Sequence, residues 1–170
     1  SIAPKVAHLG VGLGLETAGN DRTFGSIGDI AALAEEFPFV RPIIDWAHIH
    51  AITGGGLTSR EAFETVVDFI RDSFPAWMIE PLQFQFTDNL VGEHGEVKHV
   101  AYGEGTLRVG HLVESAAAKG FRIVMISDAN EEESHRAIQD AIASALPEAR
   151  RPSDTDRHLG AGLEIMPGTL

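Results

Sequence analysis

Four times along this chain, a short apolar run ends in a polar side chain and is followed, after a loop, by a segment with helical periodicity. The apolar runs span residues 11–16, 39–45, 82–88 and 121–128. Parallel strands need a long crossover connection, which is usually a helix, so a strand, loop and helix that repeat in this order favour a parallel sheet. The sequence therefore predicts an α/β fold made of four successive βα units.

The segments between the strands carry apolar residues three and four positions apart, as expected for helices that cover one face of a sheet. Capping-box pairs mark two helix starts, Ser26 with Asp29 and Thr58 with Glu61. The polar stretch 89–105 has no such period, and it is predicted to be a long loop.

One folded domain is predicted over residues 1–146. The chain of 170 residues is 44% hydrophobic, which is enough for a single sizeable core. Residues 147–170 contain three prolines and no clear period, and they are expected to form a flexible C-terminal extension. Residues 1–10 resemble the end of a helix that stops at Gly10, so we expect the chain to begin partway through a larger fold.

Acidic residues outnumber basic ones by 25 to 13, which gives a formal net charge of −12. This charge disfavours broad electrostatic binding to nucleic acid. An equally open interpretation is an acidic surface adapted to a very salty cytoplasm, where charge is screened within about 3 Å at 1 M salt. The absence of cysteine excludes disulfides and thiolate ligands and favours a reducing, cytoplasmic setting. No apolar run approaches the roughly 20 residues of a membrane span, so we expect no membrane partner.

Each predicted strand ends in a side chain that can bind a metal or react. These residues are Glu16, Asp45, Gln85 and Asp128, and His48 follows Asp45 at a spacing of three. The carboxyl ends of parallel strands meet at one edge of the sheet, where α/β proteins place their working sites. Oxygen-rich sites suit magnesium or manganese, and added histidine favours zinc, manganese or iron. The sequence therefore predicts a divalent-metal site at this edge.

Ordinary structural roles are open for several of these residues. An acid at the end of a strand can cap the following helix, which applies to Asp45 and Asp128. A histidine in a long polar loop, such as His99, can be a surface residue. His50 is a candidate for a supporting contact behind the metal ligands. Glu16 follows a wholly apolar strand, and because an unpaired buried carboxylate is costly, it is expected to belong to the site.

Three motifs occur in an order and at distances that resemble one known family. They are Leu13-Gly-Leu-Glu-Thr-Ala-Gly19, Ile44-Asp-Trp-Ala-His-Ile-His-Ala51 and Lys98-His-Val-Ala-Tyr-Gly-Glu-Gly105. Together they resemble the C-terminal half of the endonuclease IV family, the apurinic/apyrimidinic endonucleases within the xylose-isomerase-like TIM barrels. The resemblance covers roughly residues 10–145. It implies a (βα)4 half of a TIM barrel that corresponds to strands five to eight.

The resemblance also implies a trinuclear zinc site that cleaves the phosphodiester 5′ to an abasic sugar in DNA. The residues that match the family's zinc ligands are Glu16, Asp45, His48 and His99. The other two strand ends, Gln85 and Asp128, complete the implied metal-binding set. Glu16 and Asp128 are, in addition, the residues expected to be catalytic.

Three positions depart from the family pattern. Gln85 stands where a histidine is expected, and its neutral amide is a poorer zinc ligand than imidazole. Val97 stands where an acid is expected two residues before His99, although Glu96 is adjacent. Asp128 is a shorter acid than the expected glutamate.

Three functions are consistent with these features. The first is an endonuclease IV-like hydrolase that acts on abasic sites in DNA with zinc. The second is a sugar or sugar-acid isomerase or epimerase, in which Glu16, Asp45, Gln85 and Asp128 hold one manganese or magnesium ion. The third is a folded but non-catalytic barrel fragment. Because half a barrel leaves strand edges and an apolar interior exposed, we expect either a longer protein that supplies an N-terminal half-barrel or pairing of two copies.

Overall fold

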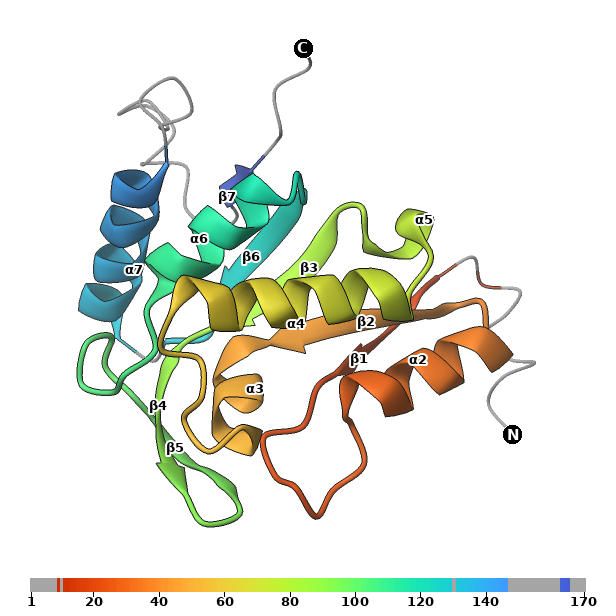
Figure 1. Cartoon of the computed structure of the whole chain (residues 1–170), viewed down its shortest axis with the longest axis horizontal. Coiled ribbons are helices and arrows are strands. Elements are labelled where there is room, and N and C mark those ends of the chain that lie inside the picture. Colours follow the sequence, from red (N-terminus) through yellow and green to blue (C-terminus); the bar gives the residue numbers. More distant parts are fainter. Residues whose placement is uncertain (1–8, 10, 130, 147–162, 166–170) are drawn as a thin grey trace.

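The computed structural model of the chain describes residues 9, 11–129, 131–146 and 163–165. Within them, four strands form a parallel sheet in the order β1-β2-β3-β6, and β7 pairs with β6 in the antiparallel sense (Figure 1). The strands of this sheet are β1 (Leu13–Glu16), β2 (Val40–Asp45), β3 (Leu82–Phe86), β6 (Ile123–Ser127) and β7 (Leu163–Ile165). The predicted α/β fold with four parallel strands is confirmed, and this sheet is compatible with half of a barrel.

Helices connect the parallel strands, as the crossover rule requires. Figure 1 shows α4 lying across β2 and β3, and α4 also contacts α2 and α6 while α6 contacts α7. The helices in the described part of the chain are α2 (Ile27–Glu36), α3 (Trp46–Ile52), α4 (Arg60–Ser73), α5 (Ala76–Ile79), α6 (Val109–Ala118) and α7 (Glu132–Ala145). No helix in this part of the chain is both long and apolar enough to cross a membrane.

The hydrophobic core lies between these helices and one face of the sheet. Trp46 is completely buried, and its ring centroid lies 5.1 Å from that of Phe63 on α4 and 5.1 Å from that of Phe84 on β3. On the other face, Gln85 is partly exposed and Ile126 is 44% exposed. The helices therefore cover one side of the sheet, and the other side and its carboxyl edge are left more open.

The helix caps agree with the predicted pattern at one helix and differ by one residue at another. Ser26 and Asp29 form the predicted capping box at the start of α2. The cap of α4 is Ser59, whose hydroxyl accepts a hydrogen bond from the backbone N–H of Ala62, and not Thr58. Serine and threonine cap helices by the same contact, so sequence alone does not separate these two neighbours.

The segment predicted as a loop over residues 89–105 contains a β-hairpin. Its strands are β4 (Asp88–Gly92) and β5 (Gly95–Val100), and they pair in the antiparallel sense. The ladder changes register beside Val97, which has no partner between the pairs Leu90–Lys98 and Val91–Glu96. This extra residue forms a β-bulge, which bends the strand and reverses its side-chain alternation.

The predicted C-terminal extension, 147–170, lies outside the described residues except for β7. The interpretation of residues 1–10 as a helix end also lies outside them, apart from residue 9.

Candidate metal centre

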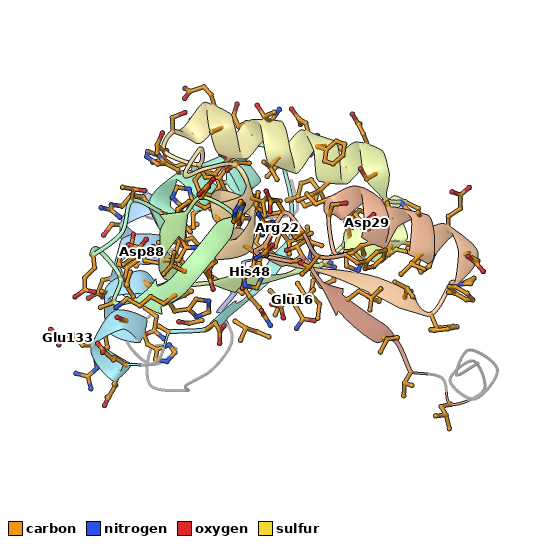
Figure 2. All side chains as sticks on the ribbon, turned by 90° about the horizontal axis from the view of Figure 1, so that it is seen from below. Glu16, Arg22, Asp29, His48, Asp88 and Glu133 are labelled. Carbon is orange, nitrogen blue, oxygen red and sulfur yellow. The ribbon has the colours of Figure 1, made fainter. Side chains whose placement is uncertain are left out.

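The carboxyl ends of β1 and β2 place Glu16, Asp45 and His48 next to one another. Asp45 is the last residue of β2 and the N-cap of α3, because its Oδ1 accepts a hydrogen bond from the backbone N–H of His48 at 3.0 Å. This cap holds His48 in the first turn of α3, with its Nδ1 3.3 Å from Oε1 of Glu16. Figure 2 shows Glu16 and His48 side by side at this end of the molecule.

The imidazole ring of His48 is oriented by a backbone carbonyl. Its Nδ1 lies 2.6 Å from the carbonyl oxygen of Thr17, which can only accept a hydrogen bond. Nδ1 therefore carries the proton and donates a hydrogen bond to this carbonyl, and Nε2 of the neutral ring keeps its lone pair. Nε2 faces the β4–β5 hairpin and lies 3.8 Å from Oε1 of Glu96.

The hairpin contributes two further groups, Glu96 and His99. The bulge at Val97 places Glu96 and His99 on the same face of β5, although they are three residues apart. Oε1 of Glu96 lies 3.1 Å from Nε2 of His99, and Oε2 accepts a hydrogen bond from Nδ2 of Asn89 at 2.9 Å. One ligand atom from each of His48, Glu96 and His99 falls within 4.8 Å of the others, which is the spacing of a metal-binding group.

A second group of the same kind is formed by Glu16, Asp45 and His48, again with ligand atoms within 4.8 Å of one another. Asp45 is only 1% exposed, and its Oδ2 has no hydrogen-bond partner. A buried carboxylate oxygen without a partner is costly, and a cation is one of the few groups that can offset that cost. The chemistry of this donor set therefore fits a divalent metal.

Burial and the repulsion between neighbouring carboxylates disfavour the charged forms of Glu16 and Asp45. Burial raises the pKa of Glu16, and the charge of Asp45 raises it further. Burial also raises the pKa of Asp45, while His48 acts in the opposite direction. Two carboxylates that resist ionisation in this way would be stabilised in the charged form by a bound cation.

The remaining predicted ligands lie at the same edge. Gln85 pairs in register with Asp45 on the neighbouring strand, and its side chain hydrogen-bonds to Glu16. Oδ2 of Asp128, just beyond β6, lies 3.7 Å from Nδ1 of His99. All six residues predicted as metal ligands are therefore close to one edge of the sheet, although Asp128 is 53% exposed.

Glu96 is the residue that sequence reasoning did not include in the site. The endonuclease IV motif that the sequence resembles has its acid at position 97, but Val97 is 66% exposed, while Glu96 occupies the position beside His99. The only sequence signal for this residue was that Glu96 is an acid adjacent to position 97. The β-bulge at Val97 explains why the acid beside His99 stands at position 96 and not at position 97.

Two other polar residues have structural roles. His50 is fully buried, its Nδ1 accepts a hydrogen bond from the backbone N–H of Leu57, and its Nε2 lies 3.0 Å from Oγ1 of Thr106. Asp88, at the start of β4, is fully buried and accepts hydrogen bonds from three backbone N–H groups of the loop that leads to α6, those of Gly103, Gly105 and Leu107. Figure 2 shows Asp88 away from the Glu16–His48 pair.

A scan of the chain against models of known protein families finds no match, and a search of curated proteins finds no significant relative.

Proposed function

We propose that this chain is a divalent-metal-dependent hydrolase of phosphate esters, of the endonuclease IV type, with zinc as its metal. The observation that carries the proposal is the convergence of His48, Glu96 and His99 with Glu16 and Asp45 at one edge of the sheet. These residues come from the ends of two strands, a helix and a hairpin. They span positions 16 to 99, so the fold is what brings them together.

The donor set matches zinc chemistry. Two imidazoles and one carboxylate form a three-residue group of the kind found in catalytic zinc sites, which keep a position open for water or substrate. A bound zinc ion would supply Lewis-acid stabilisation of the phosphoryl group and raise the acidity of water. The aligned carboxylates of Glu16 and Asp45 would hold a second cation beside it.

The surrounding residues keep these ligands in place. The carbonyl of Thr17 fixes the proton of His48 on Nδ1, and the amide of Asn89 holds the Glu96 carboxylate by one oxygen. Hydrogen bonds of this kind orient metal ligands and raise their affinity for the ion. The centre is thus preorganised by neutral groups, which leaves the negative charge of the carboxylates available to a cation.

Abasic-site DNA is the proposed substrate, on the strength of the resemblance to endonuclease IV. The net charge of −12 opposes general binding to DNA. Arg22 contributes a local positive charge in the loop after β1, where its guanidinium contacts His94 of the hairpin (Figure 2). We therefore expect binding that depends on local contacts near the metal centre and not on the overall field of the protein.

A second candidate is a sugar or sugar-acid isomerase or epimerase that uses manganese or magnesium. It is favoured by one observation: Gln85 presents an amide, and not an imidazole, next to Glu16 and Asp45. Oxygen donors without nitrogen suit the harder ions.

The test compares zinc content, DNA cleavage and sugar isomerisation for the wild-type chain and His99→Ala. The proposal expects bound zinc and cleavage of a duplex with one abasic site, and no cleavage of the intact duplex. His99→Ala should bind less zinc and lose the cleavage activity. Isomerisation of a sugar with no DNA cleavage would support the second candidate. Absence of bound metal in excess zinc would support a non-catalytic half-barrel, whose activity needs an N-terminal half or a second copy.

A further inference from the structure

We propose that the two cation positions of this centre take different metals. Zinc occupies the imidazole position, formed by His48, Glu96 and His99, and manganese or magnesium occupies the oxygen position, formed by Glu16, Asp45, Gln85 and Asp128. The inference rests on the proposed metal centre, but it does not depend on which reaction the centre performs.

The hydrogen bond between His48 and Thr17 separates the two positions chemically. An imidazole can bind a metal only through a nitrogen that carries no proton. Nδ1 of His48, the nitrogen nearest to Glu16 and Asp45, donates a hydrogen bond to the carbonyl oxygen of Thr17 at 2.6 Å and therefore carries the proton. The ring therefore offers a metal ligand only at Nε2, on the side of Glu96. His48 belongs to the imidazole position, and the oxygen position receives no nitrogen from it.

His99 belongs to the same imidazole position. Its Nε2 is 3.1 Å from Oε1 of Glu96, whereas its Nδ1 faces Oδ2 of Asp128 at 3.7 Å. When Nε2 binds a metal, the proton of the neutral ring is on Nδ1, which faces the Asp128 carboxylate. Asp128 therefore lies between the two positions, beside His99 of the imidazole position. His99 supplies no nitrogen ligand to the oxygen position.

The oxygen position is defined by a buried oxygen that lacks a partner. Oδ2 of Asp45 has no hydrogen-bond donor, although the Asp45 side chain is 1% exposed. Gln85 adds an amide on the adjacent strand, in register with Asp45 and hydrogen-bonded to Glu16. Asp128 lies at the same edge, where its backbone N–H donates a hydrogen bond to the carbonyl of Phe86, the residue after Gln85, at 3.1 Å. This position therefore combines carboxylates with a neutral amide.

These donor sets have different metal preferences. Carboxylate and amide oxygens suit manganese and magnesium, whereas imidazole favours zinc. Zinc binds most sites more tightly than manganese does, so the difference is visible only when zinc is limiting. With free zinc buffered low and manganese in excess, zinc is expected at the imidazole position and manganese at the oxygen position.

The experiment loads the metal-free chain under those conditions and measures both metals by elemental analysis, with electron paramagnetic resonance to identify bound manganese. We expect about one zinc and about one manganese per chain, with a manganese signal distinct from that of the aqueous ion. His99→Ala should lose the zinc and keep the manganese. Asp128→Asn, at a largely exposed side chain, should weaken manganese binding and leave the zinc in place.

The decisive variant is Gln85→His, which adds an imidazole to the oxygen position. It should exchange manganese for a second zinc. Gln83→His is the matched control, because Gln83 is a partly exposed glutamine on the same strand and the same face, two residues before Gln85. Gln83 pairs with Ile43 and Val124 and not with Asp45. This control should therefore keep one zinc and one manganese. Urea unfolding of each variant verifies that it is folded.

Three results would overturn the inference: two zinc ions in the wild-type chain under limiting zinc, manganese that remains aqueous, or equal zinc contents in Gln85→His and Gln83→His. Different results would contradict the proposed function and the mixed-metal centre. A chain that holds zinc and manganese as expected but cleaves no phosphodiester contradicts the hydrolase and not the mixed-metal centre. A chain that cleaves DNA and holds two zinc ions under limiting zinc contradicts the mixed-metal centre alone.

Discussion

Thr17 holds both Asp45 and His48 in place, from a different segment of the chain. Its hydroxyl oxygen accepts a hydrogen bond from the backbone N–H of Asp45 at 3.0 Å, and its carbonyl accepts one from Nδ1 of His48 at 2.6 Å. Thr17 is 1% exposed, so water does not compete for these contacts. The first residue after β1 therefore fixes the geometry at the end of β2.

The first prediction concerns the role of His48 in metal binding. His48→Ala removes Nε2 from the imidazole position, and zinc affinity should fall by at least about tenfold, or ~1.4 kcal/mol. A competition titration against a chromophoric chelator measures the change. His135→Gln, on α7, is the control and should leave zinc affinity unaltered. Equal affinities for His48→Ala and wild type would remove His48 from the centre.

A second prediction separates Glu96 from its neighbours on the hairpin. Glu96→Gln replaces the carboxylate between His48 and His99 with a neutral amide, so zinc binding should weaken about tenfold or more. Glu93→Gln removes the same charge from an exposed position at the hairpin turn and should have little effect. The same chelator titration compares the two variants, and equal losses would indicate a general charge effect.

The position of the bulge can be tested in the same background. Val97→Asp places an acid at the position where the endonuclease IV motif has one. Because Val97 is 66% exposed and lies in the bulge, its side chain points away from His99, and the substitution should not restore zinc binding to Glu96→Gln. Recovery of zinc affinity in the double variant would mean that the hairpin pairs in a different register.

The parallel sheet and the grouping of most candidate ligands at one edge were predictable because both depend on local patterns. Apolar runs mark the strands, and the carboxyl edge of a parallel sheet collects whatever follows each run, which placed Glu16, Asp45 and Gln85 together. The contribution of Glu96 was not predictable in this way. It depends on a bulge, which is set by the pairing of β5 with β4 and leaves no mark in the periodicity of the sequence.

The β4–β5 hairpin was not predicted because its sequence is polar. Asp88, Asn89 and Glu96 are polar residues in the strands, so the stretch has the composition of a loop. In the structure each of these side chains is hydrogen-bonded, although Oδ1 of the buried Asn89 has no partner. The sequence alone does not distinguish a polar residue that is hydrogen-bonded inside the fold from a polar residue that is exposed to solvent.

Asp88 is predicted to be a stability residue and not a metal ligand. Its two oxygens accept hydrogen bonds from the backbone N–H groups of Gly103 and Gly105 at 3.0 Å and of Leu107 at 3.2 Å. Asp88→Asn keeps the shape but replaces one acceptor oxygen with a donor, so the free energy of unfolding should fall by about 3 kcal/mol. Urea denaturation measures this loss.

The control for Asp88 is Asp72→Asn, which removes an exposed carboxylate from α4 and should change stability by less than about 0.5 kcal/mol. The folded fraction of Asp88→Asn should bind as much zinc as the wild-type chain. Loss of zinc with unchanged stability would place Asp88 in the metal centre instead.

The last prediction concerns the dependence of stability on pH. Burial lowers the pKa of His50 below its ordinary value of 6.5, although the charge of Asp88 acts in the opposite direction. The folded chain therefore resists protonation at a pH where the unfolded chain accepts the proton, so His50 lowers stability as the pH falls below about 6.5. His50→Asn does not titrate and can still accept the hydrogen bond from the N–H of Leu57.

Urea unfolding of both proteins between pH 5 and 8 isolates this effect, because every other titrating group is common to the two. At pH 8 the wild-type chain should be the more stable one, by roughly 1 kcal/mol, since the imidazole fits the contacts with Leu57 and Thr106. The difference should shrink as the pH falls below about 6.5, because only the wild-type chain then loses stability through His50. Parallel stability curves for the two proteins would mean that His50 is protonated as readily in the folded state as in the unfolded one.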